Sequence, residues 1–333
     1  MGVRALLVQA GERLVVDCRW SPVARLLAEG GAGAWRPADG TEADVRVEVE
    51  PQHRPFDIRG WRPLARGAHV RDRSVVLHNA CGSGFDLCLT VVAEQLQVRA
   101  RWRPPARERI AALLLRSRFH LLVRAVLLQY PALWWAGHYG RVPLHAGAVT
   151  LGRSVPLLAG PGGTGRSTLL LRAVADGGRA CADNLCVTDG RDVFGLVEPV
   201  RVEGGGGRRM AYGRSERPLP SRVDSLRPDR LVVLCRRPGA RPSVRPADPA
   251  RAARSLVAGT YMAGELRRYW PFAAALALGT GLGPAHPPVT GAAQELARLL
   301  PADELVLGDR PDEGLAALYG LVSRPVARTE ERP

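Results

Sequence analysis

The feature that most constrains this chain is a glycine-rich turn between an apolar segment and a helical one. Residues 155–159 are predicted to form an apolar strand, and residues 160–168 follow as Gly-Pro-Gly-Gly-Thr-Gly-Arg-Ser-Thr. The pattern then becomes helical over residues 166–175. Glycine permits the sharp reversal because it lacks a Cβ atom. The segment therefore predicts a sheet backed by helices in this half of the chain.

The same turn has the composition of a phosphate-binding loop, or P-loop. Its glycines let backbone N–H groups face a phosphate, and the N-terminus of the following helix adds a partial positive charge. The residues predicted to hold a nucleotide are Gly160, Gly162, Gly163, Thr164, Gly165, Arg166, Ser167 and Thr168. Ser167 is predicted to bind Mg²⁺, with Thr168 beside it. The alternative is a turn between strand and helix that binds nothing.

Arg166 stands where a P-loop usually carries a lysine that reaches the β- and γ-phosphates. The chain contains no lysine, so all 47 of its Lys and Arg residues are arginine. An arginine supplies the same charge as a bulky planar fork, so the exchange is not conservative at a tight phosphate site. We expect Arg166 to act near the phosphates, with reduced turnover as one consequence of the exchange.

Polar residues on both sides of the loop carry a family resemblance. Leu144-His145-Ala146 lies just upstream, and Ala182-Asp183-Asn184 follows the predicted helix. This succession resembles the catalytic domain of HPr kinase/phosphorylase and its relatives, whose P-loop is akin to that of the ATP-dependent phosphoenolpyruvate carboxykinases. The match is close over residues 145–189 and looser through the rest of the C-terminal half. It implies an α/β P-loop kinase-like fold of this type for the C-terminal domain.

The resemblance also implies ligands and roles, with ATP and Mg²⁺ as the cofactors. It places His145 near the transferred phosphate, and Asp183 and Asn184 at an acidic pair that serves Mg²⁺ and activates the acceptor hydroxyl. An amide at Asn184 cannot accept a proton, so Asp183 has to bind metal or act as the base. The implied catalytic residues are thus His145, Asp183, Asn184 and Arg166, and the implied metal ligands are Ser167 and Asp183. His145 as a structural histidine, and Asp183 with Asn184 as the start of a turn, are the alternatives.

Further along the chain the resemblance weakens. Glu198 and Arg201 match the family's metal- and phosphate-holding residues only loosely, and a surface salt bridge is the favoured interpretation. The run of glycines at residues 204–207 is predicted to be a flexible loop, which leaves room for a substrate other than a phosphocarrier protein.

The first hundred residues alternate in the manner of strands, at residues 14–18, 45–49, 74–77, 85–92 and 96–102. Residues 1–105 are therefore predicted to form a β-rich domain. A helical pattern carried by Ile110, Leu113, Leu114, Phe119, Leu122 and Val126 follows, with Pro131 expected to bend or end the helix and leave residues 132–137 as a connector. We place a helical connector at 106–142, the P-loop domain at 143–325 and a tail at 326–333.

In the C-terminal half, strands are predicted at residues 148–151, 180–188, 230–235 and 305–307. Helices are predicted within residues 249–278, and at 291–300 and 312–322.

Composition narrows the classes of partner. The formal charge of +15 would favour nucleic acid, but it comes from arginine spread along the chain, without interleaved aromatics or a zinc spacing, so nucleic acid is not the expected partner. Residues 125–137 and 270–283 are apolar but shorter than a membrane span, and we interpret them as buried helices. Six cysteines without a disulfide or zinc pattern, and the lack of an export signal, predict a cytoplasmic protein without a membrane partner.

The expected function is ATP-dependent transfer of the γ-phosphoryl group to a hydroxyl, a serine or threonine of a protein or peptide or a small metabolite. A homo-oligomer is an expectation of the resemblance alone. The rival from another class is a non-catalytic nucleotide-binding regulatory module, favoured by Arg166 and Asn184. A basic nucleic-acid-binding protein is the third hypothesis.

Overall fold

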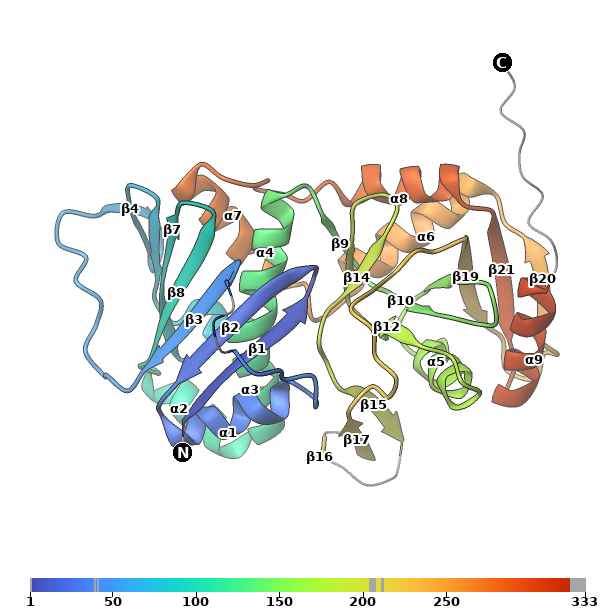
Figure 1. The fold of residues 1–333 in the computed structure, drawn as a ribbon, viewed down its shortest axis with the longest axis horizontal. Coiled ribbons are helices and arrows are strands. Elements are labelled where there is room, and N and C mark those ends of the chain that lie inside the picture. Colours follow the sequence, from blue (N-terminus) through green and yellow to red (C-terminus); the bar gives the residue numbers. More distant parts are fainter. Residues whose placement is uncertain (1, 39, 41, 204–207, 211–212, 324–333) are drawn as a thin grey trace, which may run out of the picture. The chain divides into compact units, whose positions relative to one another are not determined.

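The computed structural model describes residues 2–38, 40, 42–203, 208–210 and 213–323. Its contacts divide the chain into two compact units, each assembled from three separate segments. Unit 1 comprises Met1–Pro143, Phe194–Leu219 and Gly264–Pro288, and unit 2 comprises Leu144–Val193, Pro220–Ala263 and Val289–Pro333. The molecule is a mixed α/β protein with several sheets (Figure 1).

Unit 1 is built on an eight-stranded sheet with the order β1-β2-β3-β8-β7-β6-β5-β4. Its strands are β1 (Val3–Gln9), β2 (Glu12–Cys18), β3 (Val45–Glu50), β4 (Arg62–Ala65), β5 (Ala68–Arg71), β6 (Ser74–Leu77), β7 (Phe85–Val92) and β8 (Gln95–Trp102). β3 runs parallel to both β2 and β8, whereas the other neighbours are antiparallel. The five strands predicted in this region are confirmed, although β2 and β6 bury consecutive side chains and do not alternate strictly.

Helices supply the rest of the unit 1 core. They are α1 (Ser21–Gly30), α2 (Ala106–Leu114), α3 (Arg116–Arg124), the π-helix η2 (Ala125–Gln129), α4 (Tyr130–His138) and α7 (Tyr269–Thr280), with the short 3-10 helix η1 (Ala80–Gly82). The side chains of Trp134 and Trp135 on α4 are fully buried. The segments expected to be buried helices are therefore helical and largely buried, with the second ending at Thr280.

Two details of the helical prediction are wrong. Residues 132–137 do not form a connector, because the backbone stays helical from η2 through Pro131 into α4, with the π-helical turn lying just before the proline. Ile110, Leu113 and Leu114 are exposed and do not share the buried face of Leu122 and Val126. The chain leaves helical geometry at Leu115 (φ −113°, ψ 59°), so the periodicity before and after this residue belongs to two helices. All of residues 106–142 cluster with unit 1.

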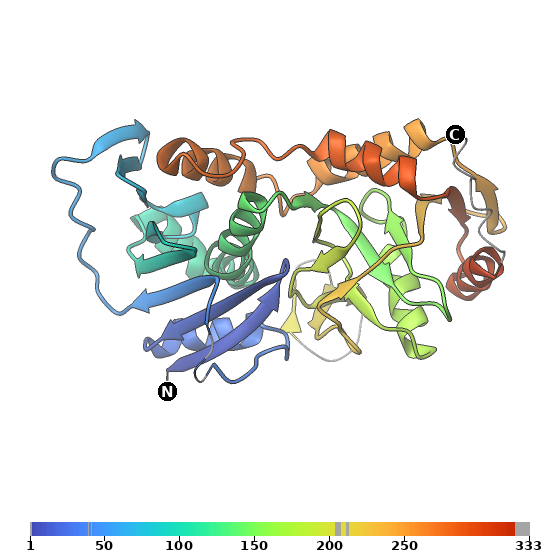
Figure 2. The same ribbon diagram turned by 45° about the horizontal axis from the view of Figure 1, so that its top comes forward.

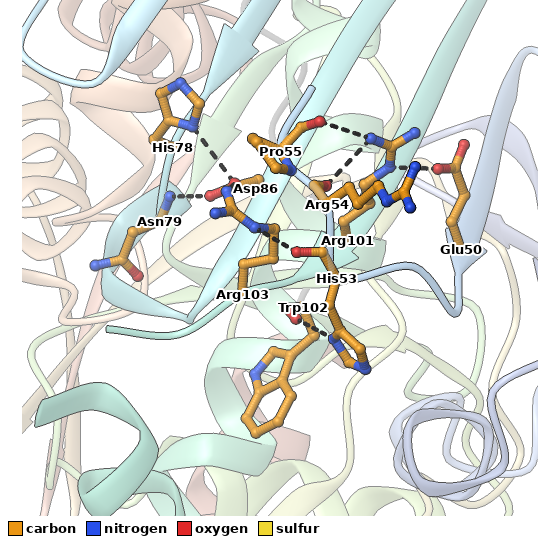
Figure 3. A network of polar contacts seen from close by, with 10 residues as sticks. All are labelled: Glu50, His53, Arg54, Pro55, His78, Asn79, Asp86, Arg101, Trp102 and Arg103. Atoms are coloured by element: carbon orange, nitrogen blue, oxygen red, sulfur yellow. Dashed lines mark hydrogen bonds and ion pairs between the residues drawn. The ribbon is translucent and has the colours of Figure 1, made fainter. Parts of the chain in front are cut away.

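A network of ion pairs and hydrogen bonds fixes the irregular segment 53–55 to the C-terminal end of β8 (Figure 3). Arg101 binds Glu50 through Nε at 2.5 Å and also donates to the backbone carbonyls of Arg54 and Pro55. Arg103 donates to the His53 carbonyl at 2.8 Å and to the carboxylate of Asp86 at 2.6 Å. Arg101 of β8 and Arg103 just beyond it thus satisfy carbonyl groups that have no sheet partner.

Unit 2 contains a six-stranded sheet with the order β12-β10-β11-β19-β21-β20. Its strands are β10 (Ala146–Val149), β11 (Pro156–Ala159), β12 (Ala180–Ala182), β19 (Arg230–Arg236), β20 (Ser243–Pro246) and β21 (Ala302–Leu307). β11, β19 and β21 are parallel neighbours, and the remaining pairs are antiparallel. The helices of the unit are α5 (Arg166–Ala175), α6 (Pro249–Met262), α8 (Val289–Leu299) and α9 (Pro311–Val322) (Figure 2).

Short strands complete the description. β15 (Val200–Glu203), β17 (Arg214–Arg217) and β16 (Arg208–Arg209) form a small antiparallel sheet in unit 1. β13 (Cys186–Thr188) and β18 (Ser225–Leu226) belong to unit 2, and a unit boundary falls within each of β9 (Val142–Leu144) and β14 (Val193–Gly195). The strand predicted over residues 180–188 is therefore two strands, interrupted at residues 183–185. The other helices and strands predicted for the C-terminal half are confirmed, except that the strand predicted at residues 148–151 lies at Ala146–Val149.

Two predicted segments, the glycine loop at 204–207 and the tail at 326–333, lie outside the described residues. Across the described residues, none of the helices has both the length and the apolar character needed to cross a membrane. All six cysteines are free thiols.

Candidate functional site

The glycine loop joins β11 to α5, so the predicted strand, turn and helix are all present in unit 2. Three of its glycines have positive φ angles: Gly160 (155°), Gly163 (87°) and Gly165 (98°). Gly160 is further restricted, since a Cβ atom there would lie 2.9 Å from the carbonyl oxygen of Leu234. Gly162 and Gly163 are exposed and would accept a Cβ atom without any contact within 4 Å. The tip of the loop is therefore open to a ligand while its start is packed against β19.

The remaining loop residues have distinct positions. Thr164 is buried and donates a hydrogen bond to the carbonyl of Pro161 at 2.9 Å, which closes the turn. Gly165 is the N-cap residue of α5, and no side chain caps this helix. Backbone N–H groups in the first turn of a helix have no partner within the helix, which is the basis of anion binding at such a terminus. Thr168 is exposed in this turn.

Ser167 and Asp183 lie side by side at the mouth of the loop. The Ser167 hydroxyl donates a hydrogen bond to Oδ2 of Asp183 at 2.9 Å. Asp183 follows β12 directly and is only 5% exposed. A hydroxyl from the first turn of α5 and a carboxylate from the end of a neighbouring strand thus converge on one point. The sequence predicted both residues as metal ligands, and the structure brings them together.

Arg166 does not extend toward the open face of the loop. Its side chain is 6% exposed, and Nε donates to the carbonyl of Asp183 at 3.0 Å. Nη1 donates to the carbonyl of Gly160 at 3.2 Å, and Nη2 donates to Oδ1 of Asn184 at 3.1 Å. The guanidinium group therefore ties the start of the loop to the end of β12. Proximity to phosphate, predicted for Arg166 by analogy with the usual lysine, stays a prediction; in the structure the long planar fork reaches backbone carbonyls of the protein.

His145 and Asn184 complete this cluster. Nε2 of His145 lies 2.8 Å from Nη2 of Arg166 and 2.8 Å from Oδ1 of Asn184. The backbone N–H of His145 donates to the hydroxyl of Thr260 at 3.1 Å. All four residues predicted as catalytic are therefore neighbours, and what each does chemically stays a prediction.

Sequence reasoning missed Thr260. This residue is fully buried on α6 and accepts the hydrogen bond from the His145 backbone while donating its own proton to the Leu256 carbonyl. Its position, 115 residues after His145, gave no local signal for the contact. Gly259 beside it gave no signal either, since a Cβ atom there would make only an ordinary van der Waals contact, 3.6 Å from the Gly160 carbonyl oxygen.

The donor atoms at Ser167 and Asp183 fit a Mg²⁺ ion bound together with a nucleotide. Both are oxygen donors, which Mg²⁺ prefers, and such an ion usually takes one or two protein ligands and completes its shell with phosphate and water. A metal site formed by protein side chains alone is not seen in the described ranges of the chain. Among the residues that the structure describes, no group of three His, Cys, Asp or Glu side chains could hold a metal.

Glu198 and Arg201 behave in part as the sequence suggested. Arg201 pairs with Glu265 at 2.9 Å and lies 3.7 Å from Glu216, all within unit 1. Burial alone would lower the pKa of Arg201, but the negative charges of Glu265, Glu198 and Glu216 outweigh it, so the pKa is raised. Glu198 is 5% exposed and so does not lie on the surface as expected.

Comparison with models of protein families finds no match for this chain, and comparison with curated proteins finds no match either.

Proposed function

We propose that the chain binds a nucleoside triphosphate, ATP in the first instance, with Mg²⁺ at residues 160–168, and transfers its γ-phosphoryl group to a hydroxyl. On this proposal the C-terminal domain is a P-loop kinase-like domain of the HPr kinase/phosphoenolpyruvate carboxykinase type. The observation that carries it is the contact between Ser167 and Asp183, 2.9 Å apart beside an open glycine loop. A hydroxyl and a carboxylate in this position are the pair that a P-loop protein uses for nucleotide-bound Mg²⁺.

Each part of the cluster would then have a definite task. The exposed glycines at 162 and 163 and the first turn of α5 would surround the phosphates with N–H groups. Bound Mg²⁺ would neutralise charge on the phosphates, held by Ser167 and Asp183. Asn184 cannot take a proton from the acceptor hydroxyl, so positioning and charge neutralisation would have to provide most of the acceleration.

The regulatory module remains the second candidate because of one observation. Arg166 already satisfies its donors with carbonyls and side chains of the protein, so no basic side chain of the loop itself faces the open tip. A P-loop that lacks a cation at the β- and γ-phosphates would bind nucleotide through backbone groups and Mg²⁺ and would stabilise the transition state poorly. Nucleotide would then only shift a conformational equilibrium.

The test measures binding and transfer separately. Purified protein is titrated with a fluorescent ATP analogue in the presence and absence of Mg²⁺, and transfer is followed with γ-labelled ATP and a peptide pool or cell extract as acceptor. Ser167→Ala and Asp183→Ala are compared with Asp176→Ala, which removes an exposed carboxylate at the other end of α5.

The kinase proposal expects Mg²⁺-dependent binding and labelled product in the wild type and in Asp176→Ala. In Ser167→Ala and Asp183→Ala, nucleotide affinity and labelled product should each fall by at least about tenfold, which is the equivalent of one charge-assisted contact. Binding without labelled product selects the regulatory module. No Mg²⁺-dependent binding to the wild-type protein refutes both candidates.

A further inference from the structure

Unit 1 contains a pocket of about 470 Å³ on a part of the chain that has no role in the proposed function. The segment 81–83, the helices α2 and α3, and Arg268 at the N-cap of α7 surround it. Its volume lies within the range of roughly 300–1,000 Å³ that small-molecule sites occupy.

One wall of the pocket is a loop held in an uncommon conformation. Asn79 and Cys81 both have positive φ angles, 46° and 57°, although neither is glycine. Such residues persist only where surrounding contacts fix them, and they gather at binding sites. The contacts here are specific, since Asn79 donates its backbone N–H to Asp86 at 2.9 Å and accepts a hydrogen bond from the backbone N–H of Gly84 at 2.8 Å.

The anchor of this wall is itself fixed. Asp86 is 2% exposed and is bound by Arg103 at 2.6 Å and approached by His78 at 3.4 Å, as Figure 3 shows. The thiol of Cys81 also donates to the backbone carbonyl of Arg268 at 3.5 Å. The loop and the start of α7 are therefore joined by a hydrogen bond.

The charges around the pocket are unequal. Three arginines, Arg107, Arg118 and Arg268, line it together with a single carboxylate, Glu108. Arg107 binds that carboxylate through Nε at 2.8 Å. Among the residues that the structure describes, Arg118 and Arg268 have no ion-pair partner within 4.0 Å. Burial raises the pKa of the Cys81 thiol to about 12, so this wall adds no negative charge at neutral pH.

Apolar side chains form the remainder of the lining. Phe119 and Leu122, one turn apart on α3, line the pocket with Ala111 and Ala112 of α2. A cavity with an apolar lining and two unneutralised guanidinium groups is complementary to a molecule that joins an apolar group to an anion. Guanidinium forks match the two oxygens of a carboxylate in particular.

We propose that this pocket binds an organic acid, with its carboxylate at Arg118 and Arg268 and its apolar group on Phe119 and Leu122. The site belongs to unit 1 alone, so it holds whether or not the glycine loop of unit 2 binds nucleotide.

The test uses three probes and the full-length protein. N-acetylphenylalanine carries both groups, its amide keeps the ring without the charge, and acetate keeps the charge without the ring. Binding is measured by calorimetry or by ligand-observed NMR. We expect N-acetylphenylalanine to bind with a Kd near or below about 1 mM and at least tenfold more tightly than either partial probe. A peptide that ends in phenylalanine with a free carboxylate is tested as well. If it binds, the pocket accepts the end of a polypeptide chain; if it does not, the pocket accepts only the small acid.

Variants assign the binding to the pocket. Arg118→Gln combined with Arg268→Gln is expected to reduce the affinity for N-acetylphenylalanine by about tenfold or more. Each exposed charge-assisted contact contributes only part of this factor, so both arginines are replaced together. The control is Arg116→Gln together with Arg267→Gln, which removes the same number of charges from sequence neighbours that do not line the pocket. Circular dichroism confirms that each variant is folded. Equal binding of the acid and its amide, unchanged binding in the pocket variant, or no binding at about 10 mM overturns the proposal.

Discussion

Replacing Arg166 distinguishes a structural arginine from a phosphate ligand. Its guanidinium group is 6% exposed and donates hydrogen bonds to the carbonyls of Asp183 and Gly160 and to the side chain of Asn184. Removing this buried charge leaves its buried acceptors without a hydrogen-bond donor, although it also relieves the cost of burying the charge. We therefore expect Arg166→Ala to lower the free energy of unfolding by about 3 kcal/mol.

A loss of this size corresponds to roughly a 10 °C fall in the melting temperature of a unit of this length. The assay is thermal or urea unfolding of the nucleotide-free protein. Arg172→Ala provides the control, because Arg172 lies on the same helix, is half-buried, and pairs with the exposed Asp312. Its loss should cost less than about 1 kcal/mol.

Arg166→Lys separates the two roles further. A lysine cannot reproduce the planar contacts to three acceptors, so we expect most of the stability loss to remain. Its flexible ammonium group could reach a bound phosphate, so nucleotide affinity should hold or rise. The reasoning is refuted if Arg166→Ala unfolds like the wild type without nucleotide but binds ATP about a hundredfold more weakly, since Arg166 would then act on phosphate alone.

Two further predictions concern the loop and unit 1. Gly160→Ala should lower the free energy of unfolding by about 2 kcal/mol in urea, and Gly163→Ala by about 1 kcal/mol. Both positions have a positive φ, but only the alanine at position 160 would meet a carbonyl oxygen at 2.9 Å. Equal losses would contradict the packing of Gly160 against β19. Burial, only partly offset by Arg141, raises the pKa of Glu12 from 4.5 to about 7, so between these values folded Glu12 keeps a proton that the unfolded chain has released. Its contribution to stability is then fully present below pH 4.5 and is lost as pH rises to about 7, and Glu12→Gln should flatten this part of the stability profile.

The glycine loop could be read from sequence because every requirement was local. The apolar strand, the glycines and the following helix are adjacent along the chain, and the structure places them as predicted. Ser167 was predicted as a metal ligand from the loop motif, and Asp183 from the family resemblance and its spacing after the helix; the structure places the two side chains 2.9 Å apart.

The direction of Arg166 could not be read in this way. It depends on three acceptors at positions 160, 183 and 184, and on a histidine whose backbone is held by Thr260. Likewise, the helical pattern over residues 110–126 looked like one apolar face until the break at Leu115 divided it. Periodicity reports which residues could share a face, whereas a single irregular residue decides which of them do.

The three-segment build of each unit has a consequence for synthesis in the cell. Unit 1 includes Gly264–Pro288, and its helix α7 buries Phe272 and Leu276. The last strand of the eight-stranded sheet is therefore translated about 170 residues before Leu276, an interval of roughly 10–30 s at ordinary elongation rates. The core of unit 2 likewise stays incomplete until the segment Val289–Pro333, which contains β21, has been translated. Neither unit can be isolated by truncation at one point, and each core stays incomplete until its third segment, which begins at Gly264 or Val289, has been translated.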